Sequence, residues 1–267
     1  MSEALLRVDN LEVVYKRAIT AVQGVSLAVA PRQIVTVLGT NGAGKTTTLR
    51  AISGFLGIDD ARVTEGSIAL KGGRIENRPP NEIARGGIAL VPERDKVFPN
   101  LTVAENLAAP VADGLTREEQ RRRQEMVYQL FPRLGDLRAR IGGLLSGGER
   151  QMLAIASALV AAPDLLLVDE LSLGLAPVVV EDLAQRLIDI RRDMGIAILL
   201  VEQSAAVGLA VADHGYVMEN GRIVLDGEPA RLKSHGDIRE FYLGQTGGDR
   251  RSYRAVKQYR RSRRWYG

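Results

Sequence analysis

The hydrophobic pattern of the chain changes between alternating and continuous runs. Across residues 5–37, and again at 66–70, apolar and polar residues alternate and are interrupted by turn residues. A period of two predicts half-buried strands, so we expect these segments to form an antiparallel layer. Residues 34–38 and 165–168 are instead short, continuous apolar runs. The run at residues 165–168 is too continuous for a half-exposed strand and is typical of a parallel strand that is buried on both faces.

A glycine-rich loop follows the first continuous run. Residues 39–46 read Gly-Thr-Asn-Gly-Ala-Gly-Lys-Thr, and residues 47–53 have helical character up to Gly54. This order of strand, loop and helix predicts a phosphate-binding (Walker A) loop, whose glycines turn backbone N–H groups toward one point. We expect Lys45 to reach the β- and γ-phosphates of ATP and the Thr46 hydroxyl to bind Mg²⁺. The predicted ATP-binding residues of this loop are Gly39, Thr40, Asn41, Gly42, Ala43, Gly44, Lys45, Thr46 and Thr47.

Two carboxylates follow the second continuous run. Asp169 and Glu170 come directly after residues 165–168, so we expect them at the carboxyl end of a central strand, where open α/β sheets bind ligands. Taken alone, such an acidic pair is more often a helix cap or a solvated turn. Downstream of a complete phosphate-binding loop, it predicts that Asp169 holds Mg²⁺ through water and that Glu170 acts as general base on the attacking water.

A second predicted anion site opens a helix. Residues 145–151 read Leu-Ser-Gly-Gly-Glu-Arg-Gln, and residues 152–161 place apolar residues at helical spacing, with Ser146 as the expected N-cap. Because the chain already has one phosphate site for its own nucleotide, we expect this turn to face the γ-phosphate of a nucleotide held by a second protomer. The residues expected to act in this way are Ser146, Gly147, Gly148 and Glu149.

With these motifs the chain resembles the ATP-binding cassette (ABC) family over residues 5–243. The resemblance implies an α/β fold with three parts: a phosphate-loop NTPase core with a parallel sheet, an antiparallel β subdomain, and a helical subdomain that carries the Ser-Gly-Gly turn. It implies ATP hydrolysis with Mg²⁺, a head-to-tail dimer around two ATP molecules, and transmembrane partners on other chains.

The resemblance also assigns two further segments. In the family an aromatic residue at the place of Tyr15 stacks on adenine, although an ordinary half-buried strand tyrosine would fit the same pattern. Thr116 and Glu119 form a capping box for a charged helix that we expect to run through Phe131. Its charged face is typical of solvated surface, and the resemblance places it in the helical subdomain.

Three residues depart from the pattern of most cassettes. Glu93 stands at the hinge between subdomains, where glutamine is usual; it can still ligate Mg²⁺, but it adds negative charge to the site. Gln203 replaces a usual histidine, and we expect it to take part in catalysis by hydrogen-bonding the γ-phosphate, without taking up a proton. Ala176 replaces the usual aspartate of the loop at residues 172–177.

These departures, with residues 98–107 and 219–224, are similar to one of the two ATPases of branched-chain amino acid importers. The resemblance implies a homo- or heterodimer with a second ABC ATPase, two transmembrane permease subunits, and a substrate-binding protein that acts indirectly. Importers for urea, amides or aromatic acids share most of the pattern and remain alternatives. A soluble cassette with a regulatory or nucleic-acid task is the alternative from another class.

Composition agrees with a cassette that relies on other chains for a transport path. The 267 residues are 45% hydrophobic, enough for one domain with subdomains. The sequence has no apolar span of 18 residues and no signal-peptide pattern at its start. It has no cysteine, which excludes disulfides and thiolate metal sites within it and suits a reducing cytoplasm. We therefore expect a peripheral protein at the cytoplasmic face of the inner membrane.

The end of the sequence differs from the rest. We expect residues 1–248 to form the nucleotide-binding domain and residues 249–267 to form a basic, aromatic tail with eight Arg and Lys and one acid. The remainder has 28 basic and 31 acidic residues, so the tail produces the formal net charge of +4. This composition suits anionic lipid or single-stranded nucleic acid, and a solvated disordered extension also fits. Of the two ligands we expect lipid, since a permease would hold the chain at a bilayer, and we expect no nucleic-acid partner.

Overall fold

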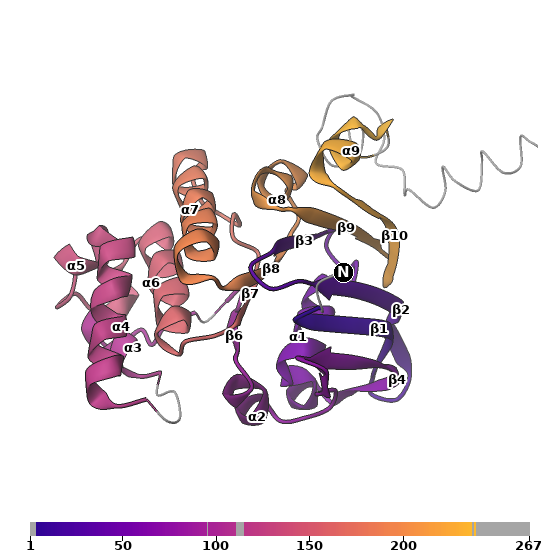
Figure 1. Ribbon diagram of the computed structural model, residues 1–267, viewed down its shortest axis with the longest axis horizontal. Helices are drawn as coiled ribbons and strands as arrows, with labels where there is room; N and C mark the ends of the chain where they lie inside the picture. The colour runs from indigo at the N-terminus through magenta and orange to yellow at the C-terminus, as the bar shows by residue number, and fades with distance from the viewer. Residues whose placement is uncertain (1–3, 95, 111–114, 237, 239–267) are drawn as a thin grey trace, which may run out of the picture.

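Two β-sheets form the frame of the molecule, with one helix between them (Figure 1). The computed structural model describes residues 4–94, 96–110, 115–236 and 238. The antiparallel sheet, in spatial order, consists of β2 (Ile19–Val29), β1 (Leu6–Tyr15), β4 (Ala61–Leu70) and β5 (Gly73–Arg74). The six-stranded sheet, in spatial order, consists of β10 (Arg222–Gly227), β9 (His214–Glu219), β3 (Ile34–Leu38), β8 (Ala197–Glu202), β7 (Leu165–Asp169) and β6 (Ile88–Val91).

Helix α1 (Lys45–Ser53) contacts strands of both sheets, whereas most other helices lie on the far side of the six-stranded sheet (Figure 1). A helical lobe at one end of the molecule consists of α3 (Val103–Ala108), α4 (Arg117–Leu130) and α5 (Pro132–Asp136), which pack on α6 (Gly147–Val160). The remaining helical segments are α2 (Pro80–Arg85), α7 (Pro177–Asp189), α8 (Ala205–Val211), α9 (Pro229–Ser234), the 3₁₀ turns η1 (Phe55–Asp59) and η2 (Gly142–Leu144), and the π-helical turn η3 (Ile190–Met194). Among the described residues, no helix is long and apolar enough to cross a bilayer.

The expected antiparallel layer is confirmed for β1, β2 and β4, but it is wrong for residues 34–37. These residues belong to β3, which lies between β8 and β9 of the other sheet and runs parallel to both. All five residues of β3 are buried, because both faces of the sheet are covered. The continuous apolar run was therefore the informative signal here. Residues 165–168 follow the same rule, since every residue of β7 is buried.

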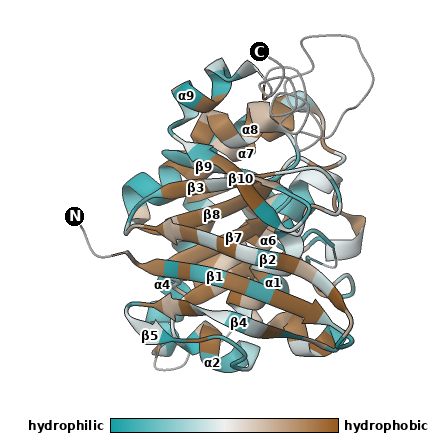
Figure 2. Cartoon of the chain, turned by 90° about the vertical axis from the view of Figure 1, so that its right-hand side faces the viewer, coloured by the Kyte–Doolittle hydropathy of each residue, from teal (hydrophilic) through white to brown (hydrophobic). Residues whose placement is uncertain are grey.

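The core has two halves, one on each face of the six-stranded sheet. Alternate side chains of a strand point to opposite faces, so Leu165 and Leu167 of β7 pack toward α1 and the antiparallel sheet. Leu166 and Val168 instead pack toward α6 and α7. Figure 2 shows the result: β3, β7 and β8 are drawn largely in hydrophobic colours, while hydrophilic segments interrupt β1.

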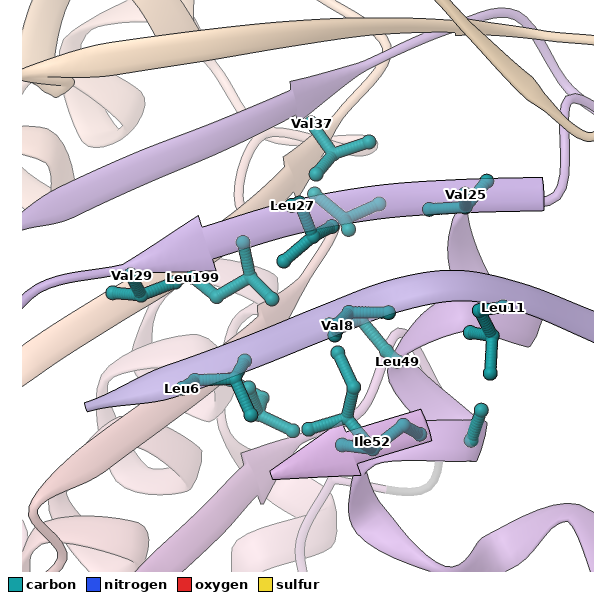
Figure 3. Close-up of a cluster of buried hydrophobic side chains, with 14 of the residues drawn as sticks. Leu6, Val8, Leu11, Val25, Leu27, Val29, Val37, Leu49, Ile52 and Leu199 are labelled. Atoms are coloured by element: carbon teal, nitrogen blue, oxygen red, sulfur yellow. The ribbon is translucent and has the colours of Figure 1, made fainter. Parts of the chain in front are cut away.

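The half between the sheets closes around helix α1 (Figure 3). Leu49 and Ile52 of α1 point into a layer of side chains that come from β1 and β2. Leu199 of β8 reaches the same cluster from the six-stranded sheet. Burial of this apolar area fixes α1, and with it the loop that precedes α1, against both sheets.

The predicted helix boundaries agree with the structure. The Ser146 side chain accepts a hydrogen bond from the Glu149 N–H and caps α6, which begins at residue 147. Thr116 and Glu119 form the predicted capping box of α4, which ends one residue before the expected position. The tail at residues 249–267 lies outside the described residues, so the division at residue 248 stays a prediction.

Replacing a central core side chain tests this packing. Leu199→Ala should lower the free energy of unfolding by about 2–5 kcal/mol, because it leaves a cavity between the sheets. Ile58→Ala is the matched control, since the Ile58 side chain is 76% exposed and its removal should change stability by less than about 0.5 kcal/mol. Urea unfolding followed by circular dichroism measures both. Equal stability losses in the two variants would contradict the core described here.

Candidate nucleotide-binding site

A cleft of about 920 Å³ opens where four strands of the six-stranded sheet end. Residues 41–47 line it after β3, Glu93 and Arg94 after β6, and Glu170 after β7. Gln203 lines it after β8. The remaining lining residues come from the β2 edge, the loop after Glu170, and the turn between β9 and β10; they are Ile19, Thr20, Ala21 and Gln23, then Leu173, then Asn220 and Gly221. The structure thus gathers most of the predicted site residues in one cleft.

The loop before α1 needs glycine at its ends for steric reasons. A Cβ atom at Gly39 would lie 2.5 Å from the carbonyl oxygen of Met218. Gly44 has φ 103°, and a Cβ atom there would lie 2.7 Å from Met218 Cε. Gly44 is also the N-cap of α1 and offers no side chain to the first N–H groups of the helix. The first N–H groups of α1 therefore have no side-chain cap, and residues 45–47, which line the cleft, can offer them to an anion.

Lys45 joins this loop to the end of β7 through a buried ion pair. Its Nζ lies 3.3 Å from Glu170 Oε1, and the two side chains are only 5% and 9% exposed. The same Nζ donates hydrogen bonds to the carbonyl oxygens of Gly39, at 2.8 Å, and Thr40, at 3.2 Å. Because Lys45 and Glu170 both line the cleft, a bound polyanion would compete with Glu170 for the Lys45 ammonium group.

Thr46 and Asp169 make a second link between the same two elements. Thr46 Oγ1 donates a hydrogen bond to Asp169 Oδ1 at 3.2 Å. A hydroxyl and a carboxylate oxygen are hard donors of the kind that would suit Mg²⁺, directly or through water. Among the described residues, no group of three or more His, Cys, Asp or Glu could hold a metal by itself. Glu93 lines the same cleft and is a further candidate oxygen ligand for a Mg²⁺ ion, beside phosphate oxygens and water.

Burial raises the pKa of Asp169 to about 6. The hydrogen bond from Thr46 opposes this shift, while the nearby negative charges of Glu170 and Glu93 add to it and Lys45 opposes it. The carboxylates gathered here thus repel one another in a site with little water. A divalent cation would relieve that repulsion.

Lys96 is a cation that sequence reasoning did not place at the site. Its Nζ donates a hydrogen bond to Gln151 Oε1 of α6, so it connects the hinge after β6 to the helix that Ser146 opens. Burial lowers the pKa of Lys96, and the negative charges of Glu93 and Asp169 act in the opposite direction. Lys96 therefore offsets part of the extra negative charge that Glu93 brings. The sequence places Lys96 three residues after Glu93, but it does not show the contact with Gln151, which lies 55 residues further along the chain.

Tyr15 lies at the end of β1, beside the loop. Its hydroxyl is 3.2 Å from Thr47 Oγ1, and its ring packs on the core between the sheets. Ile19 and Thr20, rather than Tyr15, line the cleft at this end. Stacking of Tyr15 on adenine stays a prediction.

The Ser-Gly-Gly turn lies on a different element, at the start of α6. None of the four residues Ser146, Gly147, Gly148 and Glu149, all of which the structure describes, lines the cleft. Ser146 and Gly147 are exposed, and Glu149 is held by an ion pair with Arg133 at 3.0 Å. A Cβ atom at Gly148 would lie 2.6 Å from Val179 of α7, so this position requires glycine for packing. The turn faces solvent and can meet a ligand held by another chain.

The electrostatics of Asp169 can be tested through stability. The pKa of Asp169 is about 6 in the folded protein and near 3.8 in the unfolded chain. Between these two pH values the folded state binds more protons than the unfolded state, so the free energy of unfolding falls as pH rises from about 4 to 6. Asp169→Asn keeps an oxygen that accepts the hydrogen bond from Thr46, and it removes the free-energy cost of ionising a buried carboxyl group. It should stabilise the nucleotide-free protein by about 1–3 kcal/mol at pH 7.5 and by little at pH 4.

Urea unfolding at both pH values measures the difference, with Asp136→Asn as control because Asp136 is exposed. A gain for Asp169→Asn that is the same at both pH values, or no larger than that of the control, would argue against a strained buried carboxylate.

Comparison with known proteins agrees with this geometry. The family model described as ABC transporter matches residues 22–172. The chain is 40% identical over 241 residues to the high-affinity branched-chain amino acid transport ATP-binding protein BraG of Pseudomonas aeruginosa, covering 90% of this chain and 100% of that protein. It is 36% identical to the probable branched-chain amino acid transport ATP-binding protein LivF of Archaeoglobus fulgidus, covering 90% and 99%. It is also 34% identical to the lipopolysaccharide export system ATP-binding protein LptB of Escherichia coli K12, covering 91% and 98%.

A solved structure of similar shape is the ADP conformation of an ATP-binding cassette of an ABC transporter. It superposes with a TM-score of 0.78 at 28% identity, over 91% of this chain and all of that one. The fold expected from the motifs is therefore confirmed. The matched family model, the relatives and the shared fold together show that this chain belongs to the ABC transporter ATPase family, whose members bind and hydrolyse ATP.

Proposed function

We propose that this chain is the ATP-hydrolysing subunit of an importer for branched-chain amino acids. The observation that carries the proposal is the joint similarity, over nine-tenths of the chain, to BraG and LivF. The residues at Glu93 and Gln203, which depart from most cassettes, line the nucleotide cleft and fit this branch of the family. ATP binding would favour one permease conformation and hydrolysis another, which couples the two processes.

The chemistry follows from the pairs already described. An incoming triphosphate would draw Lys45 away from Glu170 and onto the β- and γ-phosphate oxygens. Glu170 would then be free to accept a proton from the attacking water, and Gln203 would hydrogen-bond the γ-phosphate. Thr46, Asp169 and Glu93 supply the hard oxygen ligands that suit Mg²⁺, which when bound neutralises charge on the transferred phosphate.

We further propose that the site is completed by a second ABC ATPase, either a copy of this chain or a different subunit. The exposed turn at Ser146 and Gly147 lies outside the cleft of its own chain, so it is available to the nucleotide of a partner. Two permease subunits would supply the membrane path and hold the dimer at the cytoplasmic face of the membrane. Contact of residues 249–267 with anionic lipid stays part of the proposal; these residues lie outside the described part of the chain.

A second candidate is export of lipopolysaccharide, which the similarity to LptB favours. Importers for urea, amides or aromatic acids are further variants of the first proposal. The nucleotide cleft does not distinguish among them, because the solute would pass through other subunits. The partners must therefore be identified directly.

Removal of the proposed base tests the mechanism. Glu170→Gln should lower the ATPase turnover of the assembled transporter by about 10²- to 10⁴-fold while ATP still binds. Lys45→Ala should lose most ATP affinity, because the cation that meets the phosphates is gone. Phosphate release and binding of a fluorescent ATP analogue measure the two effects. Glu65→Gln on the exposed face of β4 is the matched control, and undiminished turnover in Glu170→Gln would reject the assignment.

The substrate class can be tested by purification and uptake. Affinity purification of the full chain from detergent-solubilised membranes should recover two permeases, and vesicles that contain this complex and its binding protein should take up leucine, isoleucine or valine only with ATP inside. Glu170→Gln is the control that should assemble without uptake. Recovery of lipopolysaccharide-export components, or uptake of urea or an aromatic acid instead, would replace the proposed substrate.

A further inference from the structure

A buried carboxylate lies behind the catalytic cleft, at the carboxyl end of β8. Glu202 has no exposed surface, and its oxygens accept three hydrogen bonds. The backbone N–H and the hydroxyl of Ser172 each donate at 2.9 Å, and the Ser204 N–H donates at 3.4 Å. The Glu202 carbonyl also accepts a hydrogen bond at 3.3 Å from the N–H of Gly39, the first residue of the phosphate-binding loop.

Burying a carboxylate at residue 202 costs folding free energy, because the charge loses its hydration. The five preceding residues of β8 are all apolar and buried, so a further apolar side chain would complete the strand without any desolvation of charge. Burial raises the pKa of the Glu202 carboxyl, the bonds from Ser172 act against this shift, and the negative charge of Glu170 adds to it. Packing alone does not account for Glu202.

Glu202 fixes the position of the segment that follows Glu170, because it accepts two hydrogen bonds from Ser172. Glu170 has φ 58°, a left-handed backbone conformation that costs a non-glycine residue about 1–3 kcal/mol unless the surroundings fix it. On one side, the Glu170 N–H donates to the Val201 carbonyl at 3.0 Å. On the other side, Ser172 is bound twice by Glu202. Neighbouring residues of β8 thus fix both ends of the bend that aims Glu170 at Lys45.

We propose that Glu202 is a positioning residue for ATP hydrolysis. Its carboxylate clamps Ser172 and so holds Glu170 in the bent conformation that faces the phosphate-binding loop. Because Gln203 follows directly in the chain, the same clamp ties the loop at residues 172–177 to the residue that would meet the γ-phosphate. The proposal rests on the role proposed above for Glu170 as the base.

Two substitutions at the clamp give different expected results. Glu202→Ala removes all acceptors for Ser172, and turnover should fall by about 10- to 100-fold, the order of loss expected from misplacing a reacting group by about 1 Å. Glu202→Gln keeps an oxygen for the Ser172 N–H and an amide that can donate to the Ser172 hydroxyl, so it should recover most of the activity. Affinity for a fluorescent ATP analogue should change by less than about twofold in both, which separates positioning from binding.

Leu199→Ala, on the same strand, is the control for general destabilisation. Its side chain points to the other face of β8 from Glu202 and packs in the core between the sheets, so it should lower the melting temperature at least as much as Glu202→Ala while the folded protein keeps its turnover. Ser172→Ala removes only the hydrogen bond from the Ser172 hydroxyl to Glu202. It should lower turnover by a smaller factor than Glu202→Ala, since the bond from the Ser172 N–H to Glu202 remains. If Glu202→Ala does not fold, the turnover of Ser172→Ala and Glu202→Gln tests the proposal instead. Wild-type turnover in Ser172→Ala would then overturn it.

A double variant distinguishes failure of this proposal from failure of the proposed base. If Glu202 acts through Glu170, adding Glu202→Ala to Glu170→Gln should reduce turnover by less than about threefold further. Wild-type turnover in Glu202→Ala, with Glu170→Gln inactive, would overturn the positioning role and leave the base intact. Undiminished turnover in Glu170→Gln alone would overturn the base itself. A further tenfold loss in the double variant would show that Glu202 acts elsewhere.

Discussion

The buried ion pair between Lys45 and Glu170 is the interaction on which the site depends. It joins the loop after β3 to the end of β7, and the neighbouring bond from Thr46 to Asp169 joins the same two elements again. Charges in so dry a place must be paired. A triphosphate with Mg²⁺ would offer Lys45 an anionic partner and Asp169 a cationic one, and it would leave Glu170 free to accept a proton from water. In the absence of a nucleotide, the Lys45–Glu170 and Thr46–Asp169 contacts hold these side chains in place, and a bound nucleotide would replace those contacts.

Much of this site could be predicted from the sequence because its signals are local. The glycine loop before α1, the buried strand at residues 165–168 and the N-cap at Ser146 depend on residues close in the chain, and the structure places them as expected. The prediction was wrong at residues 34–37, because an alternating segment that runs into a continuous one does not reveal that the chain changes sheets there. Lys96 and Glu202 were missed because their partners, Gln151 and Ser172, lie far away in the sequence.

The comparisons show the family of this chain, whereas the transported solute is a proposal. The nucleotide cleft is built by backbone geometry and a few charges that all members need, so BraG, LivF and LptB resemble the chain over nearly its full length. Under the proposed function the solute would pass through other subunits, so the nucleotide cleft would not need a group that selects it. Identifying the partner subunits would therefore show which solute is transported.

The most direct test of the central claim is a crystal structure of the unmodified chain with Mg²⁺ and a non-hydrolysable ATP analogue. We expect Lys45 Nζ on the β- and γ-phosphates and beyond hydrogen-bond distance of Glu170, with Thr46 and Asp169 at the Mg²⁺. We also expect the Ser146 turn of a second protomer over the γ-phosphate. An analogue bound elsewhere, or one in the cleft with the ion pair of Lys45 and Glu170 still intact, would contradict this exchange of partners.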